Sequence, residues 1–242
     1  MVEELLSPVI YEQVERPDPQ LVAALATCGV ATILEVMGHQ LGSQQMMNPS
    51  MCRRTGNGTI AGPAVTARPG LGDNLMMHVG LSLCQPGDIL VVAANGGLGA
   101  QWGEMATTYA IAHRVAGVVV DGPVRDCDAV DSVGFAVWST LVSPVAPTKV
   151  HPGWVNVPVQ CAGVSVQPGD IIVADGDGVI ALPRSVANVV LDRALARSHK
   201  EQQFRAEIVA GARLAALVGV DDQLDRLEIK RINGRWEPKQ QP

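Results

Sequence analysis

Aromatic residues are scarce in this chain, at 3% of its 242 residues. Proteins usually hold single-stranded nucleic acid by stacking its bases on aromatic side chains, so no such partner is expected. The formal net charge is −6 and no run of Lys and Arg occurs, which argues against binding to a phosphate backbone. The core must therefore be built mainly from Val, Ala, Leu and Ile.

Long apolar runs are missing as well. No stretch approaches the roughly 20 apolar residues of a membrane-spanning helix, and the acidic start, MVEELLSPVI, lacks the basic and apolar regions of a secretory signal. The five cysteines are scattered and never form a CxxC pair, so we interpret them as reduced thiols of a cytoplasmic protein. No HExxH, Cys/His pairing or GxSxG motif occurs, which argues against a zinc site and a serine hydrolase.

Hydrophobic residues at 47% and charged residues at 17% describe a globular protein with an ample core, in one large or two small domains. Asp18-Pro19 is a typical helix start. We expect that helix to end at Gly29 and a second helix over about 31–36. Residues 40–58 are polar and read as a loop, and residues 59–67 read as an edge strand or a bulge because they contain Pro63.

The stretch GDNLMMHVGL begins another predicted helix. Asp73 or Asn74 can cap it, and His78 lies among apolar residues, so we expect it in the core. The sequence QPGD occurs at 85–88 and again at 167–170, each time before an apolar run. These two copies predict similar turns that lead into buried strands.

Between the first of these strands and residue 117, residues 102–115 form a predicted helix. Met105, Tyr109, Ala112 and Ala116 lie on its apolar face. Strand, helix and strand in this order predict a βαβ unit with parallel strands. The loop GGLGAQWGE departs from the dinucleotide-binding fingerprint, because Trp102 stands where its third glycine should be.

The stretch GVVVDGPVRD at 117–126 is central to the chain. Its β-branched run predicts a buried strand, which Asp121 is expected to close, and Gly122-Pro123 is expected to turn the chain. Arg125 and Asp126 then follow at the carboxyl end of the strand, where ligands bind in open α/β sheets. The sequence leaves open whether they form a surface ion pair or a functional site.

Further along the chain, the pattern predicts a short helix to residue 133, a strand over 135–139, a strand at VNVPV and a helix over about 185–218. The final WEPKQQP is expected to be disordered.

The residues that could carry chemistry are mainly carboxylates, with Arg125 and Lys149 as cations: Glu104, Asp121, Asp126, Asp175, Asp177 and Glu201. Oxygen ligands suit a hard cation such as Mg²⁺ or Mn²⁺. Gly103 and Glu104 lie near a helix start, where backbone N–H groups bind a carboxylate, and an arginine would grip the same kind of ligand bidentately. These residues support a metal-assisted reaction on a small keto acid.

The motifs together resemble a known family. GDNLMMHVGLSLCQPGDILVV, AQWGEMAT, GVVVDGPVRD, the second QPGD segment and HKE at 199–201 are similar to the class II 4-hydroxy-4-methyl-2-oxoglutarate/4-carboxy-4-hydroxy-2-oxoadipate aldolases, which share a fold with the RraA regulators of ribonuclease activity. The resemblance runs from about residue 30 to 206. It implies a single-domain α/β/βα sandwich over 30–184, an N-terminal helical segment over 1–29, a C-terminal helical extension over 185–231 and a disordered tail over 232–242.

The same resemblance implies roles for particular residues. Asp126 would be the direct ligand of a divalent metal, with Glu104 and Glu201 holding the metal through water, Glu201 coming from an adjacent subunit of a trimer or hexamer. Arg125 would bind the pyruvyl oxygens, and backbone amides around Gly103, Glu104 and Met105 would bind the pyruvyl carboxylate. Lys149 would meet the distal carboxylate. Arg125, Asp126, Glu104 and Glu201 are thus the expected catalytic residues.

The reaction implied is cleavage of a C4-hydroxylated 2-keto diacid from aromatic acid breakdown to pyruvate plus pyruvate or oxaloacetate. Oxaloacetate decarboxylation is an expected side activity. The alternative is an RraA-type regulator that binds a ribonuclease and is not catalytic. The length of the C-terminal segment and the presence of Glu201 favour the aldolase.

Overall fold

The computed structural model describes residues 7–94 and 96–236. The chain forms two compact units, residues 1–197 and 198–242. The first unit holds the sheet, and the second consists of helical and irregular segments, with helix α8 (Ala187–Val209) beginning in the first unit and ending in the second.

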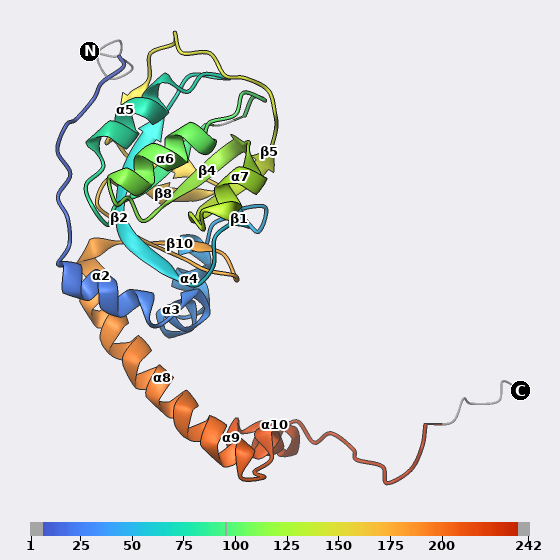
Figure 1. Cartoon of the computed structure of the whole chain (residues 1–242). Coiled ribbons are helices and arrows are strands. Elements are labelled where there is room, and N and C mark those ends of the chain that lie inside the picture. Colours follow the sequence, from blue (N-terminus) through green and yellow to red (C-terminus); the bar gives the residue numbers. More distant parts are fainter. Residues whose placement is uncertain (1–6, 95, 237–242) are drawn as a thin grey trace, which may run out of the picture. The chain divides into compact units, whose positions relative to one another are not determined.

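A mixed sheet of eight strands forms the centre of the first unit, in the order β1-β5-β4-β3-β2-β9-β10, with β6 paired to β2 (Figure 1). Strands β7 and β8 form a separate hairpin. The bounds are β1 Cys52–Thr55, β2 Ile60–Arg68, β3 Ile89–Ala93, β4 Gly117–Val124, β5 Val137–Val142, β6 Trp154–Val155, β7 Val159–Cys161, β8 Val164–Val166, β9 Ile171–Ala174 and β10 Val179–Leu182.

The helices of the first unit lie on both sides of this sheet. Their bounds are α2 Pro19–Ala26, α3 Val30–Met37, α4 His39–Gln45, α5 Leu75–Leu83, α6 Glu104–Ala112, α7 Cys127–Ser132 and a 3₁₀ turn, η1, at Arg184–Val186. The second unit contains the end of α8 and the short helices α9 (Leu214–Leu217) and α10 (Val220–Arg226).

Alternation of side chains along the strands produces three apolar layers. One face of β2, β3 and β4 packs against α5, α6 and α7, which lie together on that face in Figure 1. The opposite face packs against the β7–β8 hairpin and one face of β9–β10. The outer face of β9–β10 is covered by α2, α3 and the start of α8. This layered α/β architecture confirms the predicted fold class.

The predicted βαβ unit is present. β3 and β4 pair in parallel, with Ile89 opposite Gly117, and α6 connects them. The helix is shorter than expected, and Ala106, Thr107 and Ala110 are its buried residues, whereas Met105 and Tyr109 are exposed. The expected apolar face is therefore not the face that packs on the sheet, because the small residues allow the closer approach.

Two predictions about proline were wrong. Gly122-Pro123 does not turn the chain but lies inside β4, at an irregularity in its pairing with β5 between Val120 and Pro123. Pro63 marks neither an edge strand nor a bulge, since β2 lies between β3 and β9 and its pairings with them show no register shift. It stands where β2 changes partner from β9 to β3, so its missing N–H interrupts neither ladder.

Other local predictions had mixed outcomes. Asp18 caps α2 by accepting a hydrogen bond from Gln20 N at 2.8 Å, and α3 matches its prediction within a residue. Residues 40–58 are not one loop, because α4 and β1 form there. VNVPV is divided between β6 and β7. In both QPGD turns the aspartate accepts a hydrogen bond from the glutamine N–H three residues before it.

The structure describes only part of each chain terminus. In the N-terminal segment, residues 7–18 form no helix and α2 is the first described helix. Of the tail predicted to be disordered, residues 237–242 lie outside the described residues. No single helix in the described ranges has the length and apolarity to cross a membrane. α2 and α3, bent by 103°, pass that test as a pair by length and composition only.

Candidate active site

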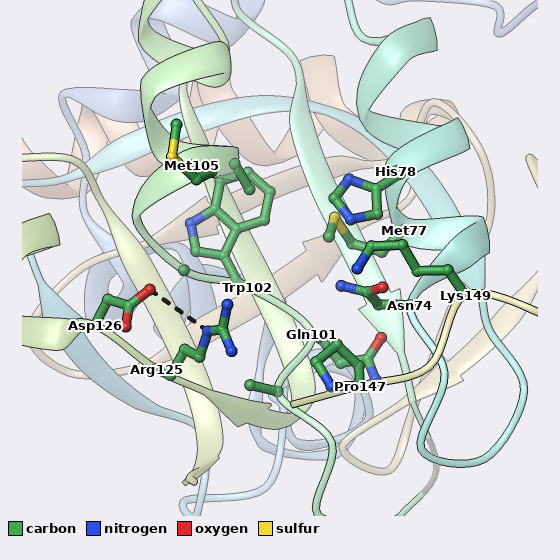
Figure 2. Close-up of a pocket in the computed structure, with 13 residues that line it drawn as sticks. Asn74, Met77, His78, Gln101, Trp102, Met105, Arg125, Asp126, Pro147 and Lys149 are labelled. Carbon is green, nitrogen blue, oxygen red and sulfur yellow. Dashed lines mark ion pairs between the residues drawn. The ribbon is translucent and has the colours of Figure 1, made fainter. Parts of the chain in front are cut away.

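A pocket of about 230 Å³ lies where the parallel strands β2, β3 and β4 end. Its walls come from the start of α5 and the residue before it, the loop between β3 and α6 with the start of α6, the end of β4 and the segment after β5. The lining residues are Asn74, Met77, His78, Ala100, Gln101, Trp102, Gly103, Met105, Ala106, Arg125, Asp126, Pro147 and Lys149 (Figure 2). The carboxyl edge of the sheet is therefore the candidate site.

Arg125 and Asp126 stand at the end of β4 on one wall of the pocket. Arg125 N donates to Trp102 O at 3.0 Å, which ties this wall to the loop before α6. Asp126 adopts a left-handed conformation, with φ 58° and ψ 32°, that non-glycine residues seldom occupy. Its Oδ2 lies 3.5 Å from Arg125 Nε and accepts a hydrogen bond from Glu104 N at 3.1 Å. Both side chains are about 40% exposed, so a ligand can reach them.

Gly103 allows the loop to approach this pair. A Cβ atom added at Gly103 would lie 2.5 Å from Asp126 Oδ2 and 3.2 Å from Arg125 Cγ. The backbone of Gly103 is extended, with φ −171°, so its role here is to leave space for the carboxylate rather than to adopt a special conformation. Any larger residue would push Asp126 away from α6.

The start of α6 faces the same space. The N-cap residue, Gly103, has no side chain to cap this helix, and the N–H of Glu104 is instead taken by the Asp126 carboxylate. The next backbone N–H groups, of Met105 and Ala106, remain available at the positive end of the helix dipole. Trp102 holds this loop in place, because its Nε1 donates to Thr107 Oγ1 at 2.8 Å and its ring stacks on Phe135. These amides suit a carboxylate ligand.

The opposite wall carries Lys149, Asn74 and His78, and Figure 2 shows the Lys149 side chain reaching into the pocket toward Asn74 and His78. His78 is exposed on this wall and not packed in the core, so that prediction was wrong. Partial burial of the imidazole and the positive charge of Lys149 both lower the pKa of His78. With Arg125 and Lys149 against Asp126, the lining carries excess positive charge and suits an anionic ligand.

Two buried amides complete the lining. Gln101 is fully buried, and its Nε2 donates to Asp73 O at 3.1 Å and Gly99 O at 3.2 Å. Gln101 Oε1 and the buried Asn74 Oδ1 accept no hydrogen bond within the described residues. Buried acceptors are rarely left unpaired, so we expect a water or a ligand to donate a hydrogen bond to each of them. Sequence reasoning missed both as site residues, although each stands in a motif quoted above.

The pocket can now be set beside known proteins. A sequence model of the RraA-like family, described as Aldolase/RraA, matches residues 27–181. The chain belongs to the RraA-like family.

Relatives of this chain include proteins named as aldolases and a protein named as a ribonuclease inhibitor. A Halalkalibacterium halodurans protein named "Putative 4-hydroxy-4-methyl-2-oxoglutarate aldolase" is 36% identical over 57% of this chain and 66% of its own length, just under two thirds. An Ectopseudomonas mendocina protein with the same name is 31% identical over 59% of this chain and 88% of its own. A crystal structure of Streptomyces coelicolor RraAS2, named as an unusual member of the RNase ES inhibitor RraA family, shares 33% identity with a TM-score of 0.71, over 80% of this chain and 99% of that one.

Several of the predicted acidic residues of this RraA-like chain lie elsewhere. Asp121 Oδ2 accepts a hydrogen bond from Ala162 N at 2.7 Å and holds the β7–β8 hairpin. Asp175 Oδ2 accepts from Val30 N at 2.8 Å, at the start of α3, and its Oδ1 accepts from Asp177 N. Glu201 belongs to the second unit. Asp121, Asp175 and Asp177, three of the six carboxylates expected to carry chemistry, therefore do not line this pocket, and that expectation was wrong for them.

Asp126 is the residue of the RraA-like pocket that fits a metal ion. Among the described residues no group of three or more His, Cys, Asp and Glu side chains gathers closely enough to enclose an ion. A single exposed carboxylate at a pocket wall suits Mg²⁺ or Mn²⁺, which keep several waters. The unpaired oxygens of Asn74 and Gln101 could accept hydrogen bonds from such waters. The residues present therefore fit a hydrated divalent ion.

Proposed function

We propose that this protein is a divalent-metal-dependent aldolase that cleaves 4-hydroxy-4-methyl-2-oxoglutarate or 4-carboxy-4-hydroxy-2-oxoadipate to pyruvate plus pyruvate or oxaloacetate. The observation that carries the proposal is the pocket itself, in which Arg125 and Lys149 face each other across a space that also holds Asp126 and the open start of α6. A keto diacid has an anionic group at each end, and the pocket offers a cation at each wall. The aldolase names of the relatives support the same reaction class.

Each residue has a part in this proposal. The backbone N–H groups of Gly103 and Met105, on either side of the Glu104 N–H that donates to Asp126, bind the pyruvyl carboxylate. The planar fork of Arg125 binds the pyruvyl oxygens. Lys149 binds the distal carboxylate. Asp126 would hold Mg²⁺ or Mn²⁺ directly, with Glu104 and, from a neighbouring subunit of a trimer or hexamer, Glu201 acting through water. When bound, the metal supplies Lewis-acid polarisation of the 2-keto group.

Cleavage moves charge in one direction. A general base takes the C4-hydroxyl proton, the C4 carbon becomes a carbonyl, and the electron pair of the C3–C4 bond passes to the pyruvyl half as an enolate. Arg125 stabilises the negative charge that grows on the enolate oxygen, and protonation of C3 then gives pyruvate. Oxaloacetate decarboxylation passes through the same enolate and is proposed as a side activity. The five free thiols agree with activity in a reducing cytoplasm.

The test is a coupled assay for pyruvate release. EDTA should abolish activity and added Mg²⁺ or Mn²⁺ should restore it. Asp126→Asn should raise the metal concentration needed and lower the rate at saturating metal. Asp128→Asn is the matched control, because Asp128 is an exposed carboxylate on α7 that does not line the pocket. Activity that resists EDTA, or an Asp126→Asn variant that is as active as Asp128→Asn, would contradict the proposed metal dependence.

A second candidate function is regulation of a ribonuclease without catalysis, which the similarity to Streptomyces coelicolor RraAS2 favours. It predicts that the protein lowers the rate of RNA cleavage by such a ribonuclease while releasing no pyruvate from either keto diacid. Both measurements on one preparation decide between the two functions.

A further inference from the structure

Asp73 is a buried carboxylate next to the pocket that does not line it. Its exposed fraction is 0%. Burial acts to raise its pKa, but hydrogen bonds from the backbone N–H groups of Val150, Leu75 and His151 and from the Thr148 hydroxyl outweigh burial and hold the pKa of Asp73 well below its usual range. The protein therefore keeps a full negative charge inside this wall, which is costly unless the charge is well paired.

The two oxygens of Asp73 bind different segments. Oδ1 accepts a hydrogen bond from Leu75 N at 2.8 Å, at the start of α5. Oδ2 accepts hydrogen bonds from Thr148 Oγ1 at 2.8 Å, Val150 N at 2.7 Å and His151 N at 3.0 Å. The His151 imidazole also lies near this oxygen, with Nδ1 at 3.3 Å. One carboxylate thus joins the helix that carries His78 to the segment that carries Lys149, which lies more than 70 residues away in the sequence.

Little else fixes residues 148–151. All four are exposed and none lies in a helix or a named strand, so burial of their side chains does not hold the segment. Backbone hydrogen bonds from Thr148 N to Gly72 O and from Asn74 N to Thr148 O, each 3.0 Å, add two further links to the same stretch. Lys149 stands between two residues that both donate to Asp73 Oδ2. The direction in which Lys149 leaves the backbone therefore depends on this carboxylate.

We propose that Asp73, acting through Thr148, is a positioning residue that directs Lys149 into the pocket and so determines the preference for ligands with a second carboxylate. The proposal rests on the proposed function for the identity of its ligands. A flexible lysine on an unfixed exposed segment would lose side-chain and backbone freedom on binding an anion. Fixing the backbone of Lys149 before binding reduces this entropic cost. Only a dicarboxylate benefits, because only its second carboxylate contacts Lys149.

The closing experiment uses Thr148→Val, which removes one of the three donors to Oδ2 but keeps the shape of the side chain, and Thr148→Ser, which keeps the donor. Binding of 2-oxoglutarate and of 2-oxopentanoate to the metal-loaded protein is measured by calorimetry. Neither probe has a C4 hydroxyl, so neither can be cleaved. We expect Thr148→Val to weaken 2-oxoglutarate about five- to tenfold, the size of one net hydrogen bond, and to leave 2-oxopentanoate unchanged. Thr148→Ser should bind both as the wild type does.

A Lys149→Met background shows whether the effect passes through the lysine. There Thr148→Val should add no further loss of 2-oxoglutarate binding. Equal weakening of both probes, failure of Thr148→Ser to behave as the wild type, or an undiminished effect in Lys149→Met would overturn the positioning role. The proposed aldolase function stands or fails separately, by pyruvate release from 4-hydroxy-4-methyl-2-oxoglutarate. A protein that shows the binding preference but releases no pyruvate would keep this inference and lose the aldolase.

Discussion

Replacing Gly103 by alanine should damage the site while leaving the fold intact. The new methyl carbon would lie 2.5 Å from Asp126 Oδ2, and ordinary contact begins near 3.4 Å, so the two atoms must separate by about 0.9 Å. The atom that moves ends a short, partly exposed side chain, and the extended backbone of Gly103 suits alanine. The hydrogen bond from Glu104 N to Asp126 Oδ2, now 3.1 Å, would be broken.

The expected magnitude follows from this displacement. A misplacement of about 1 Å in a catalytic arrangement costs on the order of 10²-fold in rate, or about 2.7 kcal/mol of transition-state stabilisation. The free energy of unfolding should change by less than about 1 kcal/mol, since alanine restricts the unfolded chain more than glycine does and partly offsets the contact. The variant should thus be folded and nearly inactive.

Full kinetics of pyruvate release at saturating Mg²⁺, together with urea unfolding, measure both quantities. Gly176→Ala is the matched control, because its added Cβ would come no closer than 3.5 Å to another atom, Arg53 Nη2, and it lies outside the pocket. Wild-type kcat/KM in Gly103→Ala would refute the geometric reasoning. So would a loss of activity that only accompanies a loss of folding.

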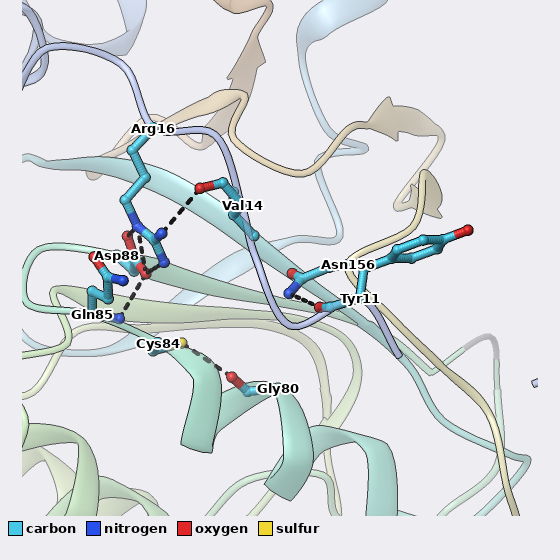
Figure 3. A network of polar contacts seen from close by, with 8 residues as sticks. All are labelled: Tyr11, Val14, Arg16, Gly80, Cys84, Gln85, Asp88 and Asn156. Carbon is cyan, nitrogen blue, oxygen red and sulfur yellow. Dashed lines mark hydrogen bonds and ion pairs between the residues drawn. The ribbon is translucent and has the colours of Figure 1, made fainter. Parts of the chain in front are cut away.

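Three further predictions concern stability and assembly. Arg16→Gln should lower the free energy of unfolding by about 3 kcal/mol, because it leaves a buried carboxylate without its ion-pair partner. Arg16 Nη2 lies 2.7 Å from Asp88 Oδ2, and the Asp88 side chain is 1% exposed (Figure 3). A change under about 1 kcal/mol in urea unfolding would contradict this prediction. The pKa of Asp73 is lower in the folded chain than the ordinary value of about 3.9, so its stabilisation is complete above that value and is lost as pH falls toward the folded pKa. The difference in free energy of unfolding between the wild type and Asp73→Asn should therefore become smaller from pH 5 to pH 3. A difference that grows over this range would contradict the lowered pKa of Asp73. Arg125→Ala and Glu201→Ala should each be inactive alone. If Glu201 acts across subunits, mixing and reassembling the two variants should restore part of the activity. Mixed oligomers that are confirmed to form but show no activity would contradict a role of Glu201 in the neighbouring subunit's site.

The sequence by itself determined the features that depend on neighbouring residues. The helix start at Asp18-Pro19, the two QPGD turns and the buried strand that leads to Arg125 and Asp126 follow from local hydrogen bonding and from side-chain pattern, and the structure contains each of them. The parallel βαβ unit follows in the same way, because only a crossover connection can join parallel neighbours. The family was also evident from these motifs.

Only the tertiary structure decided how distant segments meet. One pocket contains Lys149, Gln101 and Asn74 because three parallel strands end at the same edge of the sheet. The register of these strands depends on how distant segments pair, so no single segment of the sequence predicts it. Asp73 could be read as a helix cap, but its three donors from residues 148–151 come from a segment that folds beside it only in the complete sheet. Pro63 and Pro123 were misjudged for the same reason. Whether a missing N–H breaks a ladder depends on which strand lies opposite, and long-range packing sets that.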